Sequence, residues 1–317
     1  MRSADRLALR LKALARRRSK NLGRVRELAG RWRALPRYDT REALDLLVAW
    51  TRERLRFSGA KKAVFGASGG VDSSLVACVL ARAFPGRCEA YLLPCDSAPA
   101  DERDASRLLG LLRIRARRVD LAPAVEALLP LLSPAGPTAL GNLKTRLRTL
   151  ILFHEAAAHG GLFVGTGDLD EGFVGYYTKG SGSDLSPIGS LHKSEVRALL
   201  KLALSPLDAA FARRLSRKPA DAGLVRGRTA EVELGVGYDA IQRSIDVIVE
   251  TCNLYEGGAV PREVDAFAER FRRAGVSERD FQKVVDLVAR SRHKAEGSPV
   301  LWREDTSRSS LAEFASE

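Results

Sequence analysis

The segment Lys61–Ser74, which reads KKAVFGASGGVDSS, constrains the fold more than any other part of the chain. Its apolar run 63–65 predicts a buried parallel strand, and the pattern from Asp72 onward predicts a helix. Gly69 and Gly70 lie between them, where they allow the backbone to turn tightly and to approach a ligand closely. The N–H groups at the start of the following helix face any anion bound there. We therefore expect a phosphate-binding loop between a strand and a helix.

Polar side chains surround these glycines. Ser68, Ser73 and Ser74 provide hydroxyl donors, and Asp72 can hold a divalent cation beside the phosphates. The loop lacks the lysine of the G-x-x-x-x-G-K-[ST] motif, so it is not of the Walker type. Residues 68–73 instead resemble the S-G-G-x-D-S loop of the ATP-pyrophosphatase group, whose members hold the pyrophosphate end of ATP and activate a substrate on the α-phosphate. The alternative is an ordinary strand-to-helix turn.

The order of the predicted elements indicates an α/β fold. Further short strands are expected at 89–94, 116–119 and 162–164, with helices between them. This alternation predicts a doubly wound, mainly parallel sheet with helices on both faces, Rossmann-like and of the ATP-pyrophosphatase type. Ligands bind such sheets beyond the carboxyl ends of the strands, where the glycine loop lies. We expect a basic helical extension over 1–38, one catalytic domain with C-terminal helices over 39–300, and a flexible polar tail over 301–317.

The positive charge of the chain is concentrated at its N-terminus. Residues 1–40 carry thirteen Lys and Arg against three Asp and Glu, a net charge of +10 out of a total of +13. The rest of the chain is nearly neutral, so binding to nucleic acid is not expected except through this extension. The extension is open to three interpretations: a helical appendage that is solvated or packed on another subunit, an arm that contacts polyanions, or an Arg-rich targeting leader.

Composition excludes several other classes. No apolar run approaches the ~20 residues of a membrane span, and no signal-peptide pattern is present. The four cysteines form no CxxC pair and no metal-ligand spacing, which is typical of reduced thiols. These features predict a cytoplasmic protein that does not contact a membrane.

Two further regions carry residues that suit a ligand site. Asp168, Asp170 and Glu171 follow the predicted strand at 162–164, on the edge of the sheet where the loop lies; alternatively, these acids simply begin a solvated helix. Lys193 is expected at the start of a helix. Arg146 lies two positions from a second arginine on another helix, so the two side chains project from different faces.

Beyond residue 160 the chain resembles the NAD synthetases, and the likeness covers roughly residues 40–300. That family has a GTG or GTD strand end, an acid, G-[YF]-[YF]-T-K, a glycine-rich loop, then Asp, Pro and Lys. The later motifs are K-P-x-[ST]-A-x-L, E-L-G-[IV]-x-Y and a His-Lys pair. The corresponding residues in order are Gly165–Gly167, Glu171, Gly175–Lys179, Asp184, Pro187, Lys193, Lys218–Leu224, Glu233–Tyr238 and His293–Lys294.

The resemblance implies a role for each matching residue. It implies that ATP is bound by Ser68, Gly69, Gly70, Val71, Asp72, Ser73, Ser74, Thr166, Lys193 and Asp221, with Mg²⁺ on Asp72 and Glu171. It implies that deamido-NAD⁺ is bound by Arg146, Lys179, Asp184, His293 and Lys294. Asp72, Glu171 and Lys193 are then the catalytic set.

The implied reaction forms a C–N bond. The nicotinic carboxylate of deamido-NAD⁺ attacks the α-phosphorus of ATP, pyrophosphate leaves, and ammonia displaces AMP from the acyl-adenylate to give NAD⁺. The glutamine-using members of the family carry a large additional domain, for which a 40-residue head is too short, so the ammonia-dependent form is expected. The family also implies a homodimer.

Several positions depart from the family pattern. The loop between Lys179 and Asp184 is about two residues short, Asp221 replaces a Ser or Thr that contacts ATP, and Arg228 begins a stretch that replaces Gln-Thr-Asp-Glu. A ligase for another nucleotide-like carboxylic acid therefore stays an alternative. A catalytically weak binding protein that uses its basic head is a third.

Overall fold

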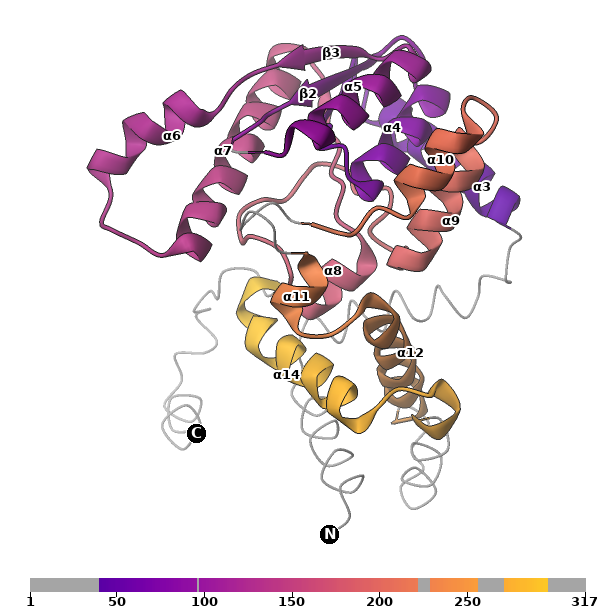
Figure 1. The fold of residues 1–317 in the computed structure, drawn as a ribbon. Coiled ribbons are helices and arrows are strands. Elements are labelled where there is room, and N and C mark those ends of the chain that lie inside the picture. The colour runs from indigo at the N-terminus through magenta and orange to yellow at the C-terminus, as the bar shows by residue number, and fades with distance from the viewer. Residues whose placement is uncertain (1–39, 96, 222–228, 256–270, 296–317) are drawn as a thin grey trace, which may run out of the picture.

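The computed structural model describes residues 40–95, 97–221, 229–255 and 271–295 of the 317-residue chain. Strands and helices alternate in its first half (Figure 1). The elements of this half are α3 Thr40–Phe57, β1 Ala63–Gly66, α4 Val71–Ala83, β2 Cys88–Leu92, α5 Pro99–Leu112, β3 Arg115–Arg118, α6 Ala122–Leu128, the short 3₁₀ helix η1 Leu129–Leu131, α7 Pro137–Ala158 and β4 Leu162–Phe163. The helices that follow are α8 Leu169–Val174, α9 Lys193–Leu204, α10 Ala209–Ser216, α11 Ala230–Leu234, α12 Tyr238–Tyr255 and α14 Glu278–Ala295.

The four strands of the described residues form one parallel sheet in the order β3-β2-β1-β4. In its register Val64 lies opposite Glu89 of β2 and Phe163 of β4. The order reverses at β1, because the chain moves outward to β2 and β3 and then returns to the other side of β1 at β4. The glycine loop follows β1, so it lies at the point of reversal, where open α/β sheets bind ligands. The predicted parallel sheet is confirmed.

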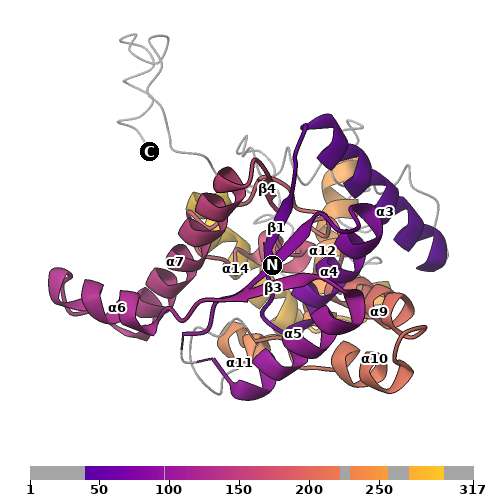
Figure 2. The ribbon, with the colours of Figure 1, turned by 90° about the horizontal axis from the view of Figure 1, so that it is seen from above.

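Alternate residues of β1 bury their side chains in different layers. Ala63 and Phe65 are fully buried in the core formed with α3, α4, α5, α9 and α10, whereas Val64 is fully buried in a second core with α7. This follows from the two-residue period of a strand. Figure 2 shows α7 on one side of the sheet and α4 and α5 on the other. The predicted helices on both faces are confirmed.

The C-terminal helices have a core of their own. Val174 of α8, Leu234 of α11, Ile241 of α12 and Phe281 of α14 are buried against one another. In Figure 1 these helices lie below the layer that contains the sheet. Helix α12 also contacts α9, so the helical cluster approaches the main body where α8 and α9 begin.

The predicted starts of two helices agree closely with the structure. Helix α4 begins at Val71, one residue before the expected Asp72, and α9 begins at Lys193 with His192 as its N-cap. Residues 1–38 and 301–317 lie outside the described residues, so the division of the chain into domains stays a prediction.

Two further observations concern composition. No helix of the described residues is long and apolar enough to cross a membrane.

Cys78, Cys88 and Cys95 are buried, and burial raises the pKa of Cys78 and of Cys88 to about 12. A thiol with such a high pKa is a poor nucleophile. The side chain of Cys252 lies outside the described residues.

Candidate active site

Residues 68–74, which we call the phosphate cradle, connect β1 to α4. Gly69 has a φ of +76°, a left-handed conformation that strains any residue with a Cβ. The Ser73 hydroxyl lies 3.0 Å from that of Ser68, and the Ser74 hydroxyl donates to the Gly70 carbonyl at 2.6 Å. These bonds hold the loop closed on itself. Because the first-turn N–H groups of a helix have no intrahelical acceptor, those of α4 face the space above the cradle.

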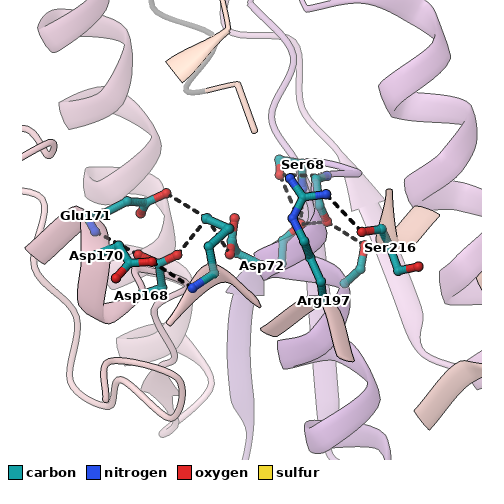
Figure 3. Close-up of polar contacts among 11 residues, drawn as sticks. Ser68, Asp72, Asp168, Asp170, Glu171, Arg197 and Ser216 are labelled. Atoms are coloured by element: carbon teal, nitrogen blue, oxygen red, sulfur yellow. Dashed lines mark hydrogen bonds and ion pairs between the residues drawn. The ribbon is translucent and has the colours of Figure 1, made fainter. Parts of the chain in front are cut away.

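Three carboxylates converge on one lysine beside the cradle (Figure 3). The Lys193 ammonium lies 2.7 Å from Asp72 Oδ1, 2.7 Å from Asp168 Oδ2 and 3.1 Å from Glu171 Oε1. The lysine side chain is only 1% exposed. A buried ammonium requires paired partners, and here the partners come from two different helices and the cap of one of them. We call these four residues the lysine–carboxylate cluster.

The elements of the fold explain why these side chains meet. Asp72 lies in the first turn of α4, and Asp168 is the N-cap of α8, where its Oδ1 accepts a hydrogen bond of 2.8 Å from the Glu171 N–H. Its other oxygen, Oδ2, pairs with Lys193, the first residue of α9. The acidic run does begin a helix, but the expectation that this helix start is solvated is wrong, because Asp168 and Asp170 are buried. Asp168 begins a helix, and it also faces the lysine.

Burial perturbs the charges of this cluster. Burial, followed by the charge of Asp168, raises the pKa of Glu171, and burial likewise raises the pKa of Asp168. Burial alone would lower the pKa of Lys193, but Glu171, Asp72 and Asp168 raise it above its ordinary value. One ammonium therefore faces three carboxyl groups, and the cluster has an excess of negative charge.

A second pair of buried groups supports the first residue of α9. Asp170 is fully buried; its Oδ1 lies 2.5 Å from His192 Nδ1, and its Oδ2 accepts a hydrogen bond of 2.8 Å from the Lys193 N–H. The outer ring nitrogen of His192 lies 3.6 Å from Asp246 of α12. Asp170 thus fixes the backbone from which the Lys193 side chain extends.

An aromatic ring covers the other side of the lysine. The Tyr238 ring centroid lies 5.0 Å from Lys193 Nζ, a distance suited to a cation–π contact. The Tyr238 hydroxyl is buried and has no hydrogen-bond partner among the described residues. Burial, followed by the charge of Glu171, raises its pKa, so the phenol stays neutral.

The cluster has the donor atoms that a magnesium ion prefers. Mg²⁺ in nucleotide sites is commonly held by one or two carboxylates together with phosphate oxygens and water. Within the part of the chain that the structure describes, no group of three or more metal-ligating side chains has a preformed metal geometry, and a lysine ammonium lies at the centre of the carboxylates. The carboxylates of Asp72 and Glu171, which contact that ammonium, supply hard oxygen ligands for a metal ion. The excess negative charge of the cluster favours a divalent cation. The residues present therefore fit the ion.

The side chains expected to bind a dinucleotide lie on the elements around the cluster. Arg146 Nε of α7 donates to the Lys179 carbonyl at 3.2 Å, whereas Arg148 Nε donates to the Leu93 carbonyl at 3.1 Å, so the two arginines do project differently. Lys294 of α14 donates to the carbonyls of Gly175 and Tyr177, at 2.9 Å each.

The structure also describes the surroundings of three other residues that were expected to bind a ligand, namely Asp184, Thr166 and Asp221. Asp184 Oδ2 accepts a hydrogen bond of 2.9 Å from the Phe163 N–H of β4, so this carboxylate supports the end of the sheet. Thr166 is half-buried just beyond β4, and Asp221 is exposed. The side chain of His293, and all of Arg228, lie outside the described residues. The binding roles of all these residues stay predictions.

Sequence reasoning assigned no role to several residues of this site. Asp168 and Asp170 stand out in the sequence only as part of an acidic run, Tyr238 and Lys218 occur only within the family motifs, and no motif singles out His192. The sequence could have indicated His192, because this residue directly precedes Lys193 at a predicted helix start. None existed for the contact between Tyr238 and Lys193, because it joins distant segments.

Comparison with known proteins identifies the family. A family model described as NAD synthase matches residues 43–298. The chain belongs to the NAD synthase family. An NH(3)-dependent NAD(+) synthetase of Pyrobaculum aerophilum is 33% identical over 265 residues, which are 79% of this chain and 89% of that protein. A protein of the same name from Carboxydothermus hydrogenoformans is 37% identical over 212 residues, 65% of this chain and 85% of that protein.

Solved structures agree with this NAD synthase fold. The NMN synthetase from Francisella tularensis has a TM-score of 0.67 and 26% identity, covering 83% of this chain and 99% of that one. The NH3-dependent NAD synthetase from Campylobacter jejuni, in complex with the nitrate ion, has a TM-score of 0.65 and covers 84% and 100%. Its identity is 22%, so this likeness bears on the fold alone. As a member of the NAD synthase family, the chain uses ATP.

Proposed function

We propose that this chain is an ammonia-dependent NAD⁺ synthetase, a C–N ligase that converts deamido-NAD⁺, ATP and ammonia into NAD⁺, AMP and pyrophosphate. The observation that carries the proposal is the lysine–carboxylate cluster beside the phosphate cradle, in a chain of the NAD synthase family. The similarity to relatives named NH(3)-dependent NAD(+) synthetase supports the choice of nitrogen donor.

The first step joins two anions. The nicotinic carboxylate attacks the α-phosphorus of ATP, the bond between the α-phosphorus and the bridging oxygen breaks, and pyrophosphate leaves. The first-turn N–H groups of α4 and the hydroxyls of Ser68 and Ser73 bind the departing phosphates. Lys193, which Asp170 and Tyr238 hold in place, offsets the repulsion between the reactants and the charge that develops in the transition state.

We propose that Mg²⁺ binds to Asp72 and Glu171. When bound, the ion neutralises the phosphate oxygens and makes the pyrophosphate a better leaving group. Asp168 then serves mainly Lys193, because its Oδ2 contacts that ammonium and its Oδ1 is used by the helix cap.

The second step needs no covalent nucleophile from the protein. Neutral ammonia attacks the acyl carbon of the adenylate, AMP leaves with the electrons of the acyl–oxygen bond, and the amide nitrogen loses its extra proton to solvent or to a nearby carboxylate.

For the dinucleotide we propose the predicted set of Arg146, Lys179, Asp184, His293 and Lys294. Arg146 and Lys294 support this choice, because both reach the glycine-rich segment 175–180, next to the helix that carries Glu171. We further propose that the active form is a homodimer and that the protein is cytoplasmic.

The decisive test measures pyrophosphate and NAD⁺ formed from Mg-ATP and ammonium, with and without deamido-NAD⁺. Pyrophosphate release should require deamido-NAD⁺, and Asp72→Asn should abolish it. Lys201→Met is the matched control, because Lys201 lies exposed on α9 and should retain wild-type activity. Chelation of Mg²⁺ should stop the reaction, and Glu171→Gln should raise the Mg²⁺ concentration needed. ATP cleavage that is indifferent to deamido-NAD⁺ would contradict the assignment.

A second candidate is the same amidation carried out on the mononucleotide acid. The similarity to the structure of an NMN synthetase, at 26% identity and 99% coverage of that chain, supports this candidate. The shortened loop between Lys179 and Asp184 is the feature of this chain that bears on the choice. A ratio of kcat/KM for the mononucleotide acid over deamido-NAD⁺ above one would move the conclusion to this candidate.

A further inference from the structure

Lys218 links the phosphate cradle to two other parts of the molecule. Its ammonium donates to the Gly69 carbonyl at 2.8 Å and pairs with Asp101 Oδ1 at 2.6 Å and Asp104 Oδ2 at 3.0 Å. The two aspartates belong to α5, and Lys218 lies two positions beyond the end of α10. One side chain thus holds together three segments that are far apart in the sequence.

The glycine at the centre of this contact has no room to move toward α5. A Cβ placed on Gly69 would lie 2.1 Å from the Asp101 carbonyl oxygen. The cradle backbone therefore already touches the first turn of α5 on that side. With its carbonyl bound by Lys218, the peptide unit of Gly69 is fixed, and the donor groups that follow it toward α4 keep one orientation.

The two aspartates pose an electrostatic problem for a polyphosphate site. Asp104 is 9% exposed and Asp101 is 34% exposed, so both are partly shielded from solvent screening. Unpaired, they would repel the ligand's phosphates. Arg214 of α10 pairs with both oxygens of Asp104, at 3.1 and 2.5 Å. Lys218 is the cation that pairs with both aspartates and also reaches the loop.

The same lysine orders the segment that ends at Asp221. Two residues separate Lys218 from Asp221, and the Ala220 carbonyl accepts a hydrogen bond of 2.8 Å from the Ala230 N–H. The strip 218–221 is therefore attached to the cradle at one end and to the start of α11 at the other.

We propose that Lys218 is a positioning residue for the pyrophosphate end of ATP: it orients the cradle through the Gly69 carbonyl and neutralises Asp101 and Asp104, without touching the ligand. This inference rests on the proposed function only in that the cradle binds the phosphates of ATP. It concerns neither the dinucleotide nor ammonia, so its effects should be confined to ATP and pyrophosphate.

The test compares substitutions at Lys218 with a matched change at Arg214. Lys218→Met should weaken binding of inorganic pyrophosphate, measured by calorimetry on the full chain, by about tenfold to a hundredfold, because the Gly69 peptide loses the hydrogen bond that fixes it and Asp101 is left as an unpaired charge that repels the ligand. The KM for ATP should rise in parallel, while the KM for deamido-NAD⁺ and for ammonium should change less than about threefold. Arg214→Met removes a counter-charge from Asp104 but leaves the cradle contact, so pyrophosphate binding should change less than about threefold.

A double variant separates positioning from charge and from misfolding. Lys218→Met with Asp101→Asn leaves no unpaired carboxylate, since Arg214 still pairs with Asp104, and circular dichroism should show a folded protein. Pyrophosphate binding should stay weakened at least severalfold. Recovery of wild-type affinity in the double variant, wild-type affinity in Lys218→Met, or equal losses in Lys218→Met and Arg214→Met would each overturn the proposal. Because pyrophosphate binding does not need deamido-NAD⁺, a failed amidation assay would refute the proposed function and leave this result standing.

Discussion

Gly69→Ala is the substitution for which the structure predicts the sharpest outcome. The residue has a φ of +76°, and an alanine held in this left-handed region costs about 1 kcal/mol. The added methyl carbon would also lie 2.1 Å from the Asp101 carbonyl oxygen and 2.8 Å from its carbonyl carbon. These are backbone atoms, so no flexible side chain can turn away. Overpacking of this kind costs about 1–3 kcal/mol. We therefore expect a loss of about 2–4 kcal/mol in the free energy of unfolding, combining both effects.

Gly59→Ala is a matched control that measures the cost of the left-handed backbone conformation alone. Gly59 has a φ of +69°, close to that of Gly69, but nothing lies within 4 Å of its added Cβ. Its substitution should cost only the conformational penalty of about 1 kcal/mol. The difference between the two variants, measured by urea unfolding at equal slopes, isolates the steric contact with α5.

The two variants should also differ in function. Relief of the clash requires the cradle or the first turn of α5 to shift, so Gly69→Ala should weaken ATP binding by at least tenfold. Gly59, at the end of α3, should leave it unchanged. Equal losses of stability in the two variants, or wild-type ATP affinity in Gly69→Ala, would refute the close contact that the structure describes.

Three other predictions concern His192, Lys193 and Asp221. First, burial on its own lowers the pKa of His192, but Asp170 and Asp246 raise it to about 10, above the ~6.5 of an unfolded chain. The folded state then holds an extra proton between these values, so this stabilisation is complete below about pH 6.5 and falls by up to about 1.4 kcal/mol per pH unit as pH rises toward 10. The stability gap between wild type and His192→Asn, measured by urea unfolding at pH 7, 8 and 9, should therefore narrow with pH; a constant gap would contradict this. Second, Lys193→Met should lower kcat/KM for ATP by on the order of 10² or more, with circular dichroism as the check on folding. Third, Asp221→Ser should lower the KM for ATP a fewfold by removing a negative charge near the phosphates; an unchanged or higher KM would place Asp221 away from them.

Much of the cradle was predictable because its chemistry is local. A strand, two glycines and a helix start within 14 residues determine where N–H groups and hydroxyls lie, and Ser68 to Ser74 form this loop in the structure. The parallel order of the sheet was predictable for a similar reason, since strands joined through helices pair in parallel. Lys193 at the start of α9 also followed from a helix pattern.

Individual partners were not predictable, because each depends on how distant segments pack. Asp184 binds the Phe163 N–H, and Lys294 donates to two backbone carbonyls, although motif position indicated only ligand contacts for both. Spacing in the sequence does not reveal which backbone donor or acceptor the fold brings next to a polar side chain.

The sequence alone determined the local devices of this protein: the glycine loop, the helix starts and the residue types that a phosphate site requires. Only the tertiary structure decided that Asp72, Asp168 and Glu171 share one buried ammonium and that Lys218 reaches a carbonyl 149 positions away. The reason is that backbone conformation is governed by neighbouring residues, whereas the pairing of buried charges is governed by which helices pack together, and a buried charge is stable only where that packing supplies its partner.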